Sequence, residues 1–398
     1  MKVALISVEG GGISSVTSGL ARSLAKKGID TSIFTGAYIH SRQTVRLCNH
    51  LEINYLPTIN MPPRHYWFQA LNLRTLMSEL KNCDVIHGVS LYASFFLSLL
   101  KNKMARPFVA TLNEDVRTGQ KMFINQPISS WSLKEMGYFF LEFPFWDIPA
   151  GRIFSSSDYV TFCSYSLLNQ VAAYRKIDYS KISVIRNGLD FNEIESVNDE
   201  PADDENKLSA IFAGRLMGTK GVMLLIKAVS QLGEDSQNVD LKIFGKGPLG
   251  NQIEKMIAKY NMKNRIKYMG QVSHKKLIAE IKKSHIVVFP SLNEAQPMFV
   301  LEAMACKKPV LAFDLPFARE LITDMENGLL AKPCDVEDLS KKIQLLANDK
   351  TLRLRLGQAA YNNVKKKHNW DIQAEKYLEV YKRLINRTQQ NSDRVLQD

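Results

Sequence analysis

Two glutamates, Glu294 and Glu302, have the residue type and spacing to bind a polar ligand. Glu294 follows a short apolar run that ends at a proline, and Glu302 lies in a segment that is otherwise apolar. A carboxylate in a buried helix needs hydrogen-bond partners, because an unpaired buried charge is costly. The vicinal hydroxyls of a ribose would supply them. The structural alternative is that Glu302 is paired with an arginine or lysine of the core.

The segment that holds these glutamates also has the features of a phosphate site. A strand is predicted at residues 285–289, and a helix follows with Pro297 at its first position, where a missing amide hydrogen costs nothing. The next amides, of Met298, Phe299 and Val300, then lack partners within the helix. Free amides at the positive end of a helix dipole, beside the carboxyl end of a strand, bind phosphate or diphosphate groups.

The stretch from Pro290 to Ala305, with seven residues between its two glutamates and a Leu-Glu-Ala-Met-Ala end, resembles glycosyltransferase family 4. The resemblance implies the two-domain GT-B fold. It also implies that Glu302 holds the ribose of a sugar nucleotide and that Glu294 contacts the donor sugar. Pro297 and the amides after it would bind the diphosphate.

Two cations, Arg215 and Lys220, follow a strand predicted at residues 208–214 and flank the turn into a helix predicted at residues 222–232. Arginine can bind a diphosphate through two hydrogen bonds, and lysine acts as a point charge. As isolated residues they would more often be solvated. Because the same pair has this place in the family, the resemblance implies that both stabilise the departing nucleoside diphosphate.

A glycine run at Gly10–Gly12 separates a strand predicted at residues 2–8 from a helix predicted at residues 14–27. Such a loop lets the backbone come close to a ligand. The alternative is a tight turn that only enters the helix. The resemblance places Gly11 and Gly12 against the bound donor and acceptor.

A second glycine turn, with Gly245 and Gly247, follows a strand predicted at residues 241–244. The resemblance places it near the nucleobase, where small residues permit close approach. A nicotinamide cofactor is not expected. The strand predicted at residues 30–36 ends in Phe-Thr-Gly, where a dinucleotide-binding sequence carries an acid.

Two positions are predicted to face the acceptor. His87 ends a strand predicted at residues 84–87, although a histidine there is more often a structural residue. Asn113 follows a strand predicted at residues 107–111, at a place where many family members carry a histidine near the reacting sugar. Asparagine can hydrogen-bond a hydroxyl but cannot carry a proton as imidazole does. This difference motivates the alternative of a protein that binds a sugar nucleotide or glycan without transferring it.

The elements that must position these residues alternate between strand and helix along 398 residues. Alternation of this kind predicts an α/β fold with parallel sheets, and the resemblance implies a GT-B arrangement of two Rossmann-like, doubly wound domains facing a cleft. We predict a first domain at residues 1–195 and a second at residues 206–370, joined by an acidic linker. A helix at about residues 371–388 would return to the first domain, and residues 389–398 would form a disordered tail.

The net charge of +12 favours anionic partners such as sugar nucleotides and acidic membrane surfaces, whereas no nucleic-acid-binding motif accompanies it. An aromatic and basic segment at residues 117–153 is predicted to lie in a membrane interface, to line an acceptor groove or to pack on the first domain. Five widely spaced cysteines, no signal-peptide pattern and no long apolar run favour a cytoplasmic protein. Peripheral contact with the inner membrane face is a further hypothesis.

These features together predict an enzyme that moves a hexose-type sugar from a nucleoside diphosphate sugar to a glycan or lipid-linked acceptor. The resemblance implies retention of the anomeric configuration and no metal, and the sequence contains no Asp-x-Asp triplet. Two alternatives stay open, namely a binding protein without transferase activity and a sugar-nucleotide epimerase of the same architecture.

Overall fold

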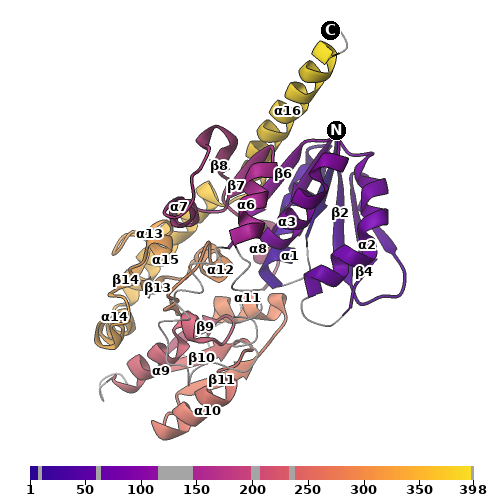
Figure 1. Ribbon diagram of the computed structural model, residues 1–398. Coiled ribbons are helices and arrows are strands. Elements are labelled where there is room, and N and C mark those ends of the chain that lie inside the picture. Colours follow the sequence, from indigo (N-terminus) through magenta and orange to yellow (C-terminus); the bar gives the residue numbers. More distant parts are fainter. Residues whose placement is uncertain (8–10, 60–63, 115–146, 199–206, 233–237, 396–398) are drawn as a thin grey trace. The chain divides into compact units, whose positions relative to one another are not determined.

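The computed structural model describes residues 1–7, 11–59, 64–114, 147–198, 207–232 and 238–395 (Figure 1). The chain divides into two compact units, each with its own sheet. The first holds the described residues of Met1–Asp115, Glu142–Gly188 and His368–Asp398, and the second holds those of Leu189–Lys367. Most of the aromatic segment predicted at residues 117–153 lies outside the described residues. Within the described ranges, no helix combines the length and the apolar character that crossing a membrane requires.

The first unit is built on an eight-stranded sheet with the order β3-β4-β2-β1-β5-β6-β7-β8. All of its pairings are parallel except that of β3 with β4. Its strands are β1 (Lys2–Ile6), β2 (Asp30–Ala37), β3 (Gln43–Cys48), β4 (Leu51–Pro57), β5 (Val85–Gly88), β6 (Phe108–Leu112), β7 (Tyr159–Phe162) and β8 (Ile182–Val184). The central strands are buried on both faces, which explains their continuous apolar sequences.

Six α-helices of the first unit are described. They are α1 (Gly11–Lys26), α2 (Arg64–Leu80), α3 (Leu91–Leu100), α6 (Asp147–Ser156), α7 (Tyr165–Ala172) and α16 (Trp370–Val395), with short 3-10 turns η1 (Lys101–Lys103) and η4 (Tyr179–Lys181). α1 packs against α16, whereas α3 packs against α2 and α6. The sheet is therefore covered by helices, as parallel strands require.

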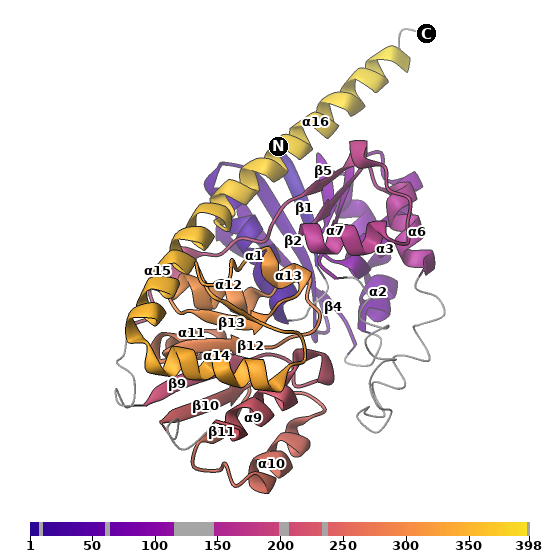
Figure 2. The ribbon, with the colours of Figure 1, turned by 90° about the vertical axis from the view of Figure 1, so that its left-hand side faces the viewer.

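The long helix α16 returns to the first unit and docks on α1 (Figure 2). Trp370 covers Gly19 so closely that a β-carbon on this glycine would lie 2.0 Å from the indole nitrogen. Ser23 donates a hydrogen bond to Asp371, and Lys27 pairs with Glu375 on the neighbouring turn. The absence of a side chain at Gly19 thus sets the docking point of the helix.

The prediction of a disordered tail at residues 389–398 is wrong for most of that segment, because α16 continues to Val395. A helix that is already anchored at one end extends into polar residues without a new nucleation cost. Residues 396–398 lie outside the described residues. The division between the units also falls after Gly188, earlier than the boundary predicted at residue 195, since Leu189 and Ile194 pack in the core of the second unit.

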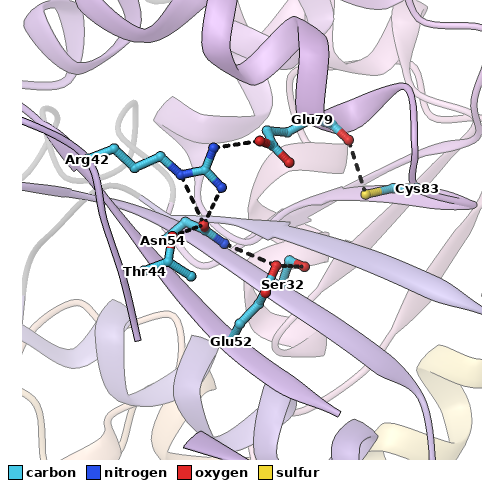
Figure 3. Close-up of polar contacts among 7 residues, drawn as sticks. All are labelled: Ser32, Arg42, Thr44, Glu52, Asn54, Glu79 and Cys83. Carbon is cyan, nitrogen blue, oxygen red and sulfur yellow. Dashed lines mark hydrogen bonds and ion pairs between the residues drawn. The ribbon is translucent and has the colours of Figure 1, made fainter. Parts of the chain in front are cut away.

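A polar network, in which Asn54 is buried and Arg42 is exposed, connects strands β2 and β4 to α2 near the edge of the first sheet (Figure 3). The amide oxygen of Asn54, a fully buried residue of β4, accepts hydrogen bonds from Nε and Nη2 of Arg42 at 3.2 and 2.6 Å. Nη1 of the same guanidinium pairs with Glu79 of α2 at 2.5 Å. Glu52 accepts a hydrogen bond from Ser32 of β2 at 2.8 Å. The members of this network bond to one another, which indicates a structural role.

The second unit is built on a six-stranded parallel sheet with the order β11-β10-β9-β12-β13-β14. Its strands are β9 (Leu208–Ala213), β10 (Val239–Phe244), β11 (Ile266–Gly270), β12 (Ile286–Phe289), β13 (Val310–Phe313) and β14 (Leu329–Ala331). The chain builds the sheet in one direction from β9 through β11, and it then resumes at β12 on the other side of β9. The sheet therefore has a topological switch point between β9 and β12.

Helices connect these strands and cover the sheet. They are α8 (Phe191–Glu195), α9 (Val222–Ser230), α10 (Gly250–Lys259), α11 (His274–Lys283), α12 (Met298–Ala305), α13 (Pro316–Arg319), α14 (Val336–Asn348) and α15 (Lys350–Lys367), with the 3-10 turn η5 (Gly218–Lys220). α9 packs against α14, and α12 packs against α11 and α15. The prediction of two doubly wound parallel-sheet domains is thus confirmed.

Candidate functional site

The predicted donor-binding residues of the second unit gather at the switch point of its sheet. Arg215 and Lys220 lie in the connection that follows β9, and Glu294 lies in the connection that follows β12. Ala210 of β9 and Ile286 of β12 are direct neighbours in the sheet. Because ligands of open α/β sheets bind at the carboxyl edge where the strand order reverses, this is the expected place for a site.

Lys220 and Glu294 form an ion pair, with Nζ and Oε1 2.5 Å apart. Ser291, which is fully buried, donates a hydrogen bond to the same carboxylate oxygen at 2.8 Å. Only 18% of the lysine side chain and 14% of the glutamate side chain are exposed. The sequence assigns these residues separate tasks, whereas the structure shows them bonded to one another. Each therefore holds the other in position.

The two connections are locked together by their backbones. Gly221 has a left-handed φ of 68°, and a β-carbon there would lie 1.9 Å from the carbonyl oxygen of Pro290. The amide of Leu292 donates to the carbonyl oxygen of Thr219 at 2.8 Å, and the hydroxyl oxygen of Ser291 lies 3.2 Å from the same carbonyl oxygen. Only glycine fits at position 221. Gly221 is absent from the residues that the sequence predicts for the site, although a glycine directly after a functional lysine is a usable signal.

Arg215 is exposed at the start of the same connection. Across the described part of the chain its side chain makes no hydrogen bond or ion pair, and its carbonyl oxygen accepts from the amide of Met217 at 3.0 Å. The guanidinium is thus accessible to an anionic ligand at the carboxyl edge of β9.

Glu302 is buried in α12, with 7% of the residue exposed. Its Oε1 accepts a hydrogen bond from Nε2 of His274, the first residue of α11, at 2.9 Å. The other ring nitrogen of His274 lies 3.5 Å from Oε1 of Glu193 in α8. The hydrogen bond to Glu302 is the main cause that raises the pKa of His274, with the charges of both glutamates adding to it.

The partner of Glu302 is thus a histidine rather than the arginine or lysine of the structural alternative. His274 is absent from the residues that the sequence predicts for the site. Its signal was a histidine at the first position of a helix, directly after the capping residue Ser273.

Pro297 is the capping residue of α12 and has an extended backbone, with φ −74° and ψ 107°. The prediction that it occupies the first helical position is wrong by one residue, because its ψ is not helical. The first bond of the helix is donated by Leu301 to the carbonyl oxygen of Pro297 at 3.3 Å. The amides of Met298, Phe299 and Val300 precede that bond, as a helix N-terminus requires.

Gly245 and Gly247 are required by the chain's own backbone. Gly245 has φ 129°, and a β-carbon on it would lie 1.9 Å from the carbonyl oxygen of Gly214. A β-carbon on Gly247 would lie 2.4 Å from the carbonyl oxygen of Leu216. These glycines therefore let the turn after β10 pack on the turn after β9, a reason that differs from the predicted approach of a nucleobase.

Gly11 and Gly12 lie in the first turn of α1 rather than in the predicted loop, because this helix begins at Gly11. Gly10 lies outside the described residues. Helical dihedrals are open to glycine, and the helix is held by the burial of Val16, Leu20 and Leu24.

His87 is fully buried inside the first unit. Its Nδ1 lies 2.7 Å from the hydroxyl of Tyr381 in α16, and its Nε2 lies 2.6 Å from the hydroxyl of Thr111. Burial lowers the pKa of His87 to about 3, so the imidazole is neutral. The prediction that His87 faces an acceptor is wrong, since both ring nitrogens are engaged in the interior.

Asn113 remains at the carboxyl edge of the first sheet. Its side-chain nitrogen donates to the carbonyl oxygen of Val89 at 2.8 Å, while its buried Oδ1 has no hydrogen-bond partner among the described residues. The buried hydroxyls of Ser7 and Thr58 likewise have no hydrogen-bond partner in the described part of the chain. These residues follow β6, β1 and β4, whose carboxyl ends share one edge of the sheet. Buried polar atoms without partners are costly, so this edge could accept ligand hydroxyls.

Comparison with known proteins gives matches along most of the chain. Residues 10–193 match the family model described as Glycosyltransferase Family 4, and residues 193–363 match the model described as Glycosyl transferases group 1. A glycosyltransferase of Methanocaldococcus jannaschii is 31% identical over 248 residues, which are 61% of this chain and 63% of that relative.

Two solved structures show the same fold. Sucrose-phosphate synthase from Thermosynechococcus elongatus has a TM-score of 0.78 at 19% identity, covering 97% of this chain and 99% of that one. Anabaena HepE, solved in complex with UDP and glucose, has a TM-score of 0.73 at 17% identity, covering 96% of this chain and all of that one.

Proposed function

This chain belongs to glycosyltransferase family 4 and has the GT-B fold, and we propose that it transfers a hexose-type sugar from a nucleoside diphosphate sugar to a glycan or lipid-linked acceptor. The observation that carries the proposal is the Lys220–Glu294 ion pair, which joins the connections that follow β9 and β12, together with Arg215 and Glu302 in those same connections. The complex of HepE with UDP and glucose supports a donor of this kind.

Arg215 and Lys220 stabilise the leaving diphosphate in this proposal. The exposed guanidinium binds it through two hydrogen bonds, and the amides of Met298, Phe299 and Val300 add the positive end of a helix dipole. Lys220 is bonded to Glu294, and the other hydrogens of its ammonium group bind the diphosphate. Fixed positive groups of this kind favour the transition state because they need no reorganisation when the bond to the sugar breaks.

Glu294 and Glu302 contact different parts of the donor. Lys220 and Ser291 both bond to Oε1 of Glu294 and keep the carboxylate in place, so that Oε2 accepts hydrogen bonds from hydroxyls of the sugar. Glu302 accepts a hydrogen bond from the ribose. Asn113, with its unpartnered amide oxygen, is assigned to the acceptor side. Retention of configuration and independence from metal are parts of the proposal that the family resemblance motivates.

The first experiment is a melting-temperature screen of the whole protein against UDP, ADP and GDP sugars, since a ligand that binds only the folded state raises its stability. The donor found in this way is then incubated with glycans and with lipid-linked acceptors in anionic and neutral vesicles. The net charge of +12 predicts better transfer on anionic vesicles at low salt.

Glu294→Ala should abolish transfer and keep much of the affinity for the nucleoside diphosphate. Glu337→Ala, which removes an exposed carboxylate of α14, is the matched control and should keep full activity. Unchanged turnover in Glu294→Ala would refute the role of Glu294. Binding without transfer would favour the binding protein, and interconversion of the donor without an acceptor would favour an epimerase.

A further inference from the structure

We infer that His274 is a positioning residue for donor binding, holding one carboxylate oxygen of Glu302 so that the other is presented to the ribose. The inference rests on the proposed function, because it concerns the same donor. It assigns a task to a side chain that the sequence motifs do not include.

The geometry around Glu302 carries the inference. The carboxylate is buried, yet the histidine that bonds to it is 46% exposed in its side chain. A hydrogen bond of 2.9 Å joins Nε2 of His274 to Oε1. The rest of α12 is apolar, so no other polar side chain of this helix can orient the carboxylate. Since a carboxylate has two oxygens with about four acceptor positions, Oε2 can still bind a hydroxyl.

The imidazole itself is held between two helices. Nδ1 of His274 lies 3.5 Å from Glu193 of α8, and Nε2 bonds to Glu302 of α12. Only the doubly protonated ring can donate to both carboxylates. α8 and α12 also pack against one another. The histidine thus links the first helix of the second unit to the helix that carries the ribose ligand.

The charges that face His274 all favour its cationic form. They are Glu302 from α12 and Glu193 from α8, and β9, which also packs on α11, carries no charged residue. On its own helix, Lys275 is the next residue and Lys276 pairs with Glu280 at 2.9 Å.

These charges predict a direction for the effect of pH. The pKa of His274 in the folded protein lies above its usual 6.5. The ring is therefore charged at pH values below this raised pKa, and it loses its charge as the pH rises through it. The hydrogen bond to Glu302 then weakens. Affinity for a ribonucleotide should therefore be highest at low pH and fall as His274 deprotonates.

The test uses the whole protein and calorimetric binding of UDP, ADP and GDP, followed by the 2′-deoxy analogue of whichever nucleotide binds. We expect His274→Ala to weaken binding of the ribonucleotide about tenfold, as loss of a charge-assisted hydrogen bond would. The 2′-deoxy analogue should be affected less, because it lacks one of the hydroxyls concerned. The effect should appear in the KM for the donor more than in kcat.

His274→Gln is the second variant, since its amide can donate to Glu302 but does not titrate. It should restore affinity and remove the dependence on pH, and it guards against a His274→Ala variant that fails to fold. His50→Gln, which alters an exposed pair with Asp30, is the matched control and should bind as the unaltered protein does.

Three outcomes would overturn the inference. The first is a His274→Ala variant that binds the ribonucleotide as tightly as the wild type does and prefers it over the 2′-deoxy analogue to the same extent. The second is tighter binding of the ribonucleotide by that variant, which would mean that the histidine competes with the ribose. The third is a wild-type protein that binds none of the nucleotides, which would overturn the proposed function as well. If the wild type binds a nucleotide and the His274 variants bind it equally well, only this inference is overturned and the proposed function stands.

Discussion

Removing either member of the Lys220–Glu294 ion pair should destabilise the second unit, and removing both should cost less than the sum of the single changes. The proposed variants are Lys220→Met and Glu294→Gln. Exposed ion pairs contribute about 0.2–1 kcal/mol, and breaking a buried pair costs about 3–5 kcal/mol. With 18% and 14% of the side chains exposed, this pair lies between those limits, and we expect about 2 kcal/mol for each single variant.

Scanning calorimetry of the whole protein would measure the effect. For a unit of 150–250 residues, about 1 kcal/mol shifts the midpoint by roughly 2–4 °C, so each single variant should lower the transition of the second unit by about 4–8 °C. The matched control is the pair of Lys341 and Glu337, which has a similar distance of 2.6 Å but side chains that are 68% and 75% exposed. Lys341→Met and Glu337→Gln should leave the midpoint unchanged.

The double variant decides whether the two side chains interact. Loss of one partner leaves the other charge mostly buried and without its ion-pair partner, and loss of both removes this penalty. A coupling free energy of about 1–3 kcal/mol is expected. Two outcomes would refute the stabilising effect of burying this pair. One is that the losses of stability in Lys220→Met and Glu294→Gln simply add in the double variant, and the other is that both single variants are as stable as those at Lys341 and Glu337.

Two further predictions concern backbone strain and buried charge. Gly245→Ala should destabilise the second unit by about 2 kcal/mol or more, because its β-carbon would meet the carbonyl oxygen of Gly214 at a φ that side chains rarely adopt. Gly270→Ala, with φ 69° but open space around the residue, is the control and should lower the stability measured by thermal unfolding less. Equal losses of stability in the two variants would contradict this explanation. For His87, whose pKa in the folded protein is about 3, the unfolded state takes up a proton that the folded state does not as the pH falls from about 6.5 towards 3. The free energy of unfolding should then fall by up to about 1.4 kcal/mol per pH unit in this window. His87→Gln should reduce the slope of melting temperature against pH. Equal slopes for the wild type and this variant would contradict the prediction.

Local patterns in the sequence were sufficient for the fold class and for the order of its parts. Continuous apolar runs such as residues 286–289 predict buried parallel strands, since both faces of such a strand are covered. The positions of Arg215 and Glu294 in the connections that follow strands were also readable, because a strand end and its following turn are adjacent in the chain. Proximity in sequence is enough for predictions of this kind.

The pairing of side chains was not readable, because it depends on packing between residues that are far apart in the chain. The sequence places His87 at a strand end, where it could contact a ligand. In the structure it bonds in the interior to Tyr381, which belongs to the last helix. The identity of the partner of Glu302 depended on where the start of α11 lies against α12. Gly245 showed the same limit, since the backbone oxygen that excludes a side chain there belongs to a neighbouring strand connection. Sequence spacing therefore identified which residues stand at the carboxyl edges of the sheets, and only tertiary packing decided which of them bond to one another and which are buried.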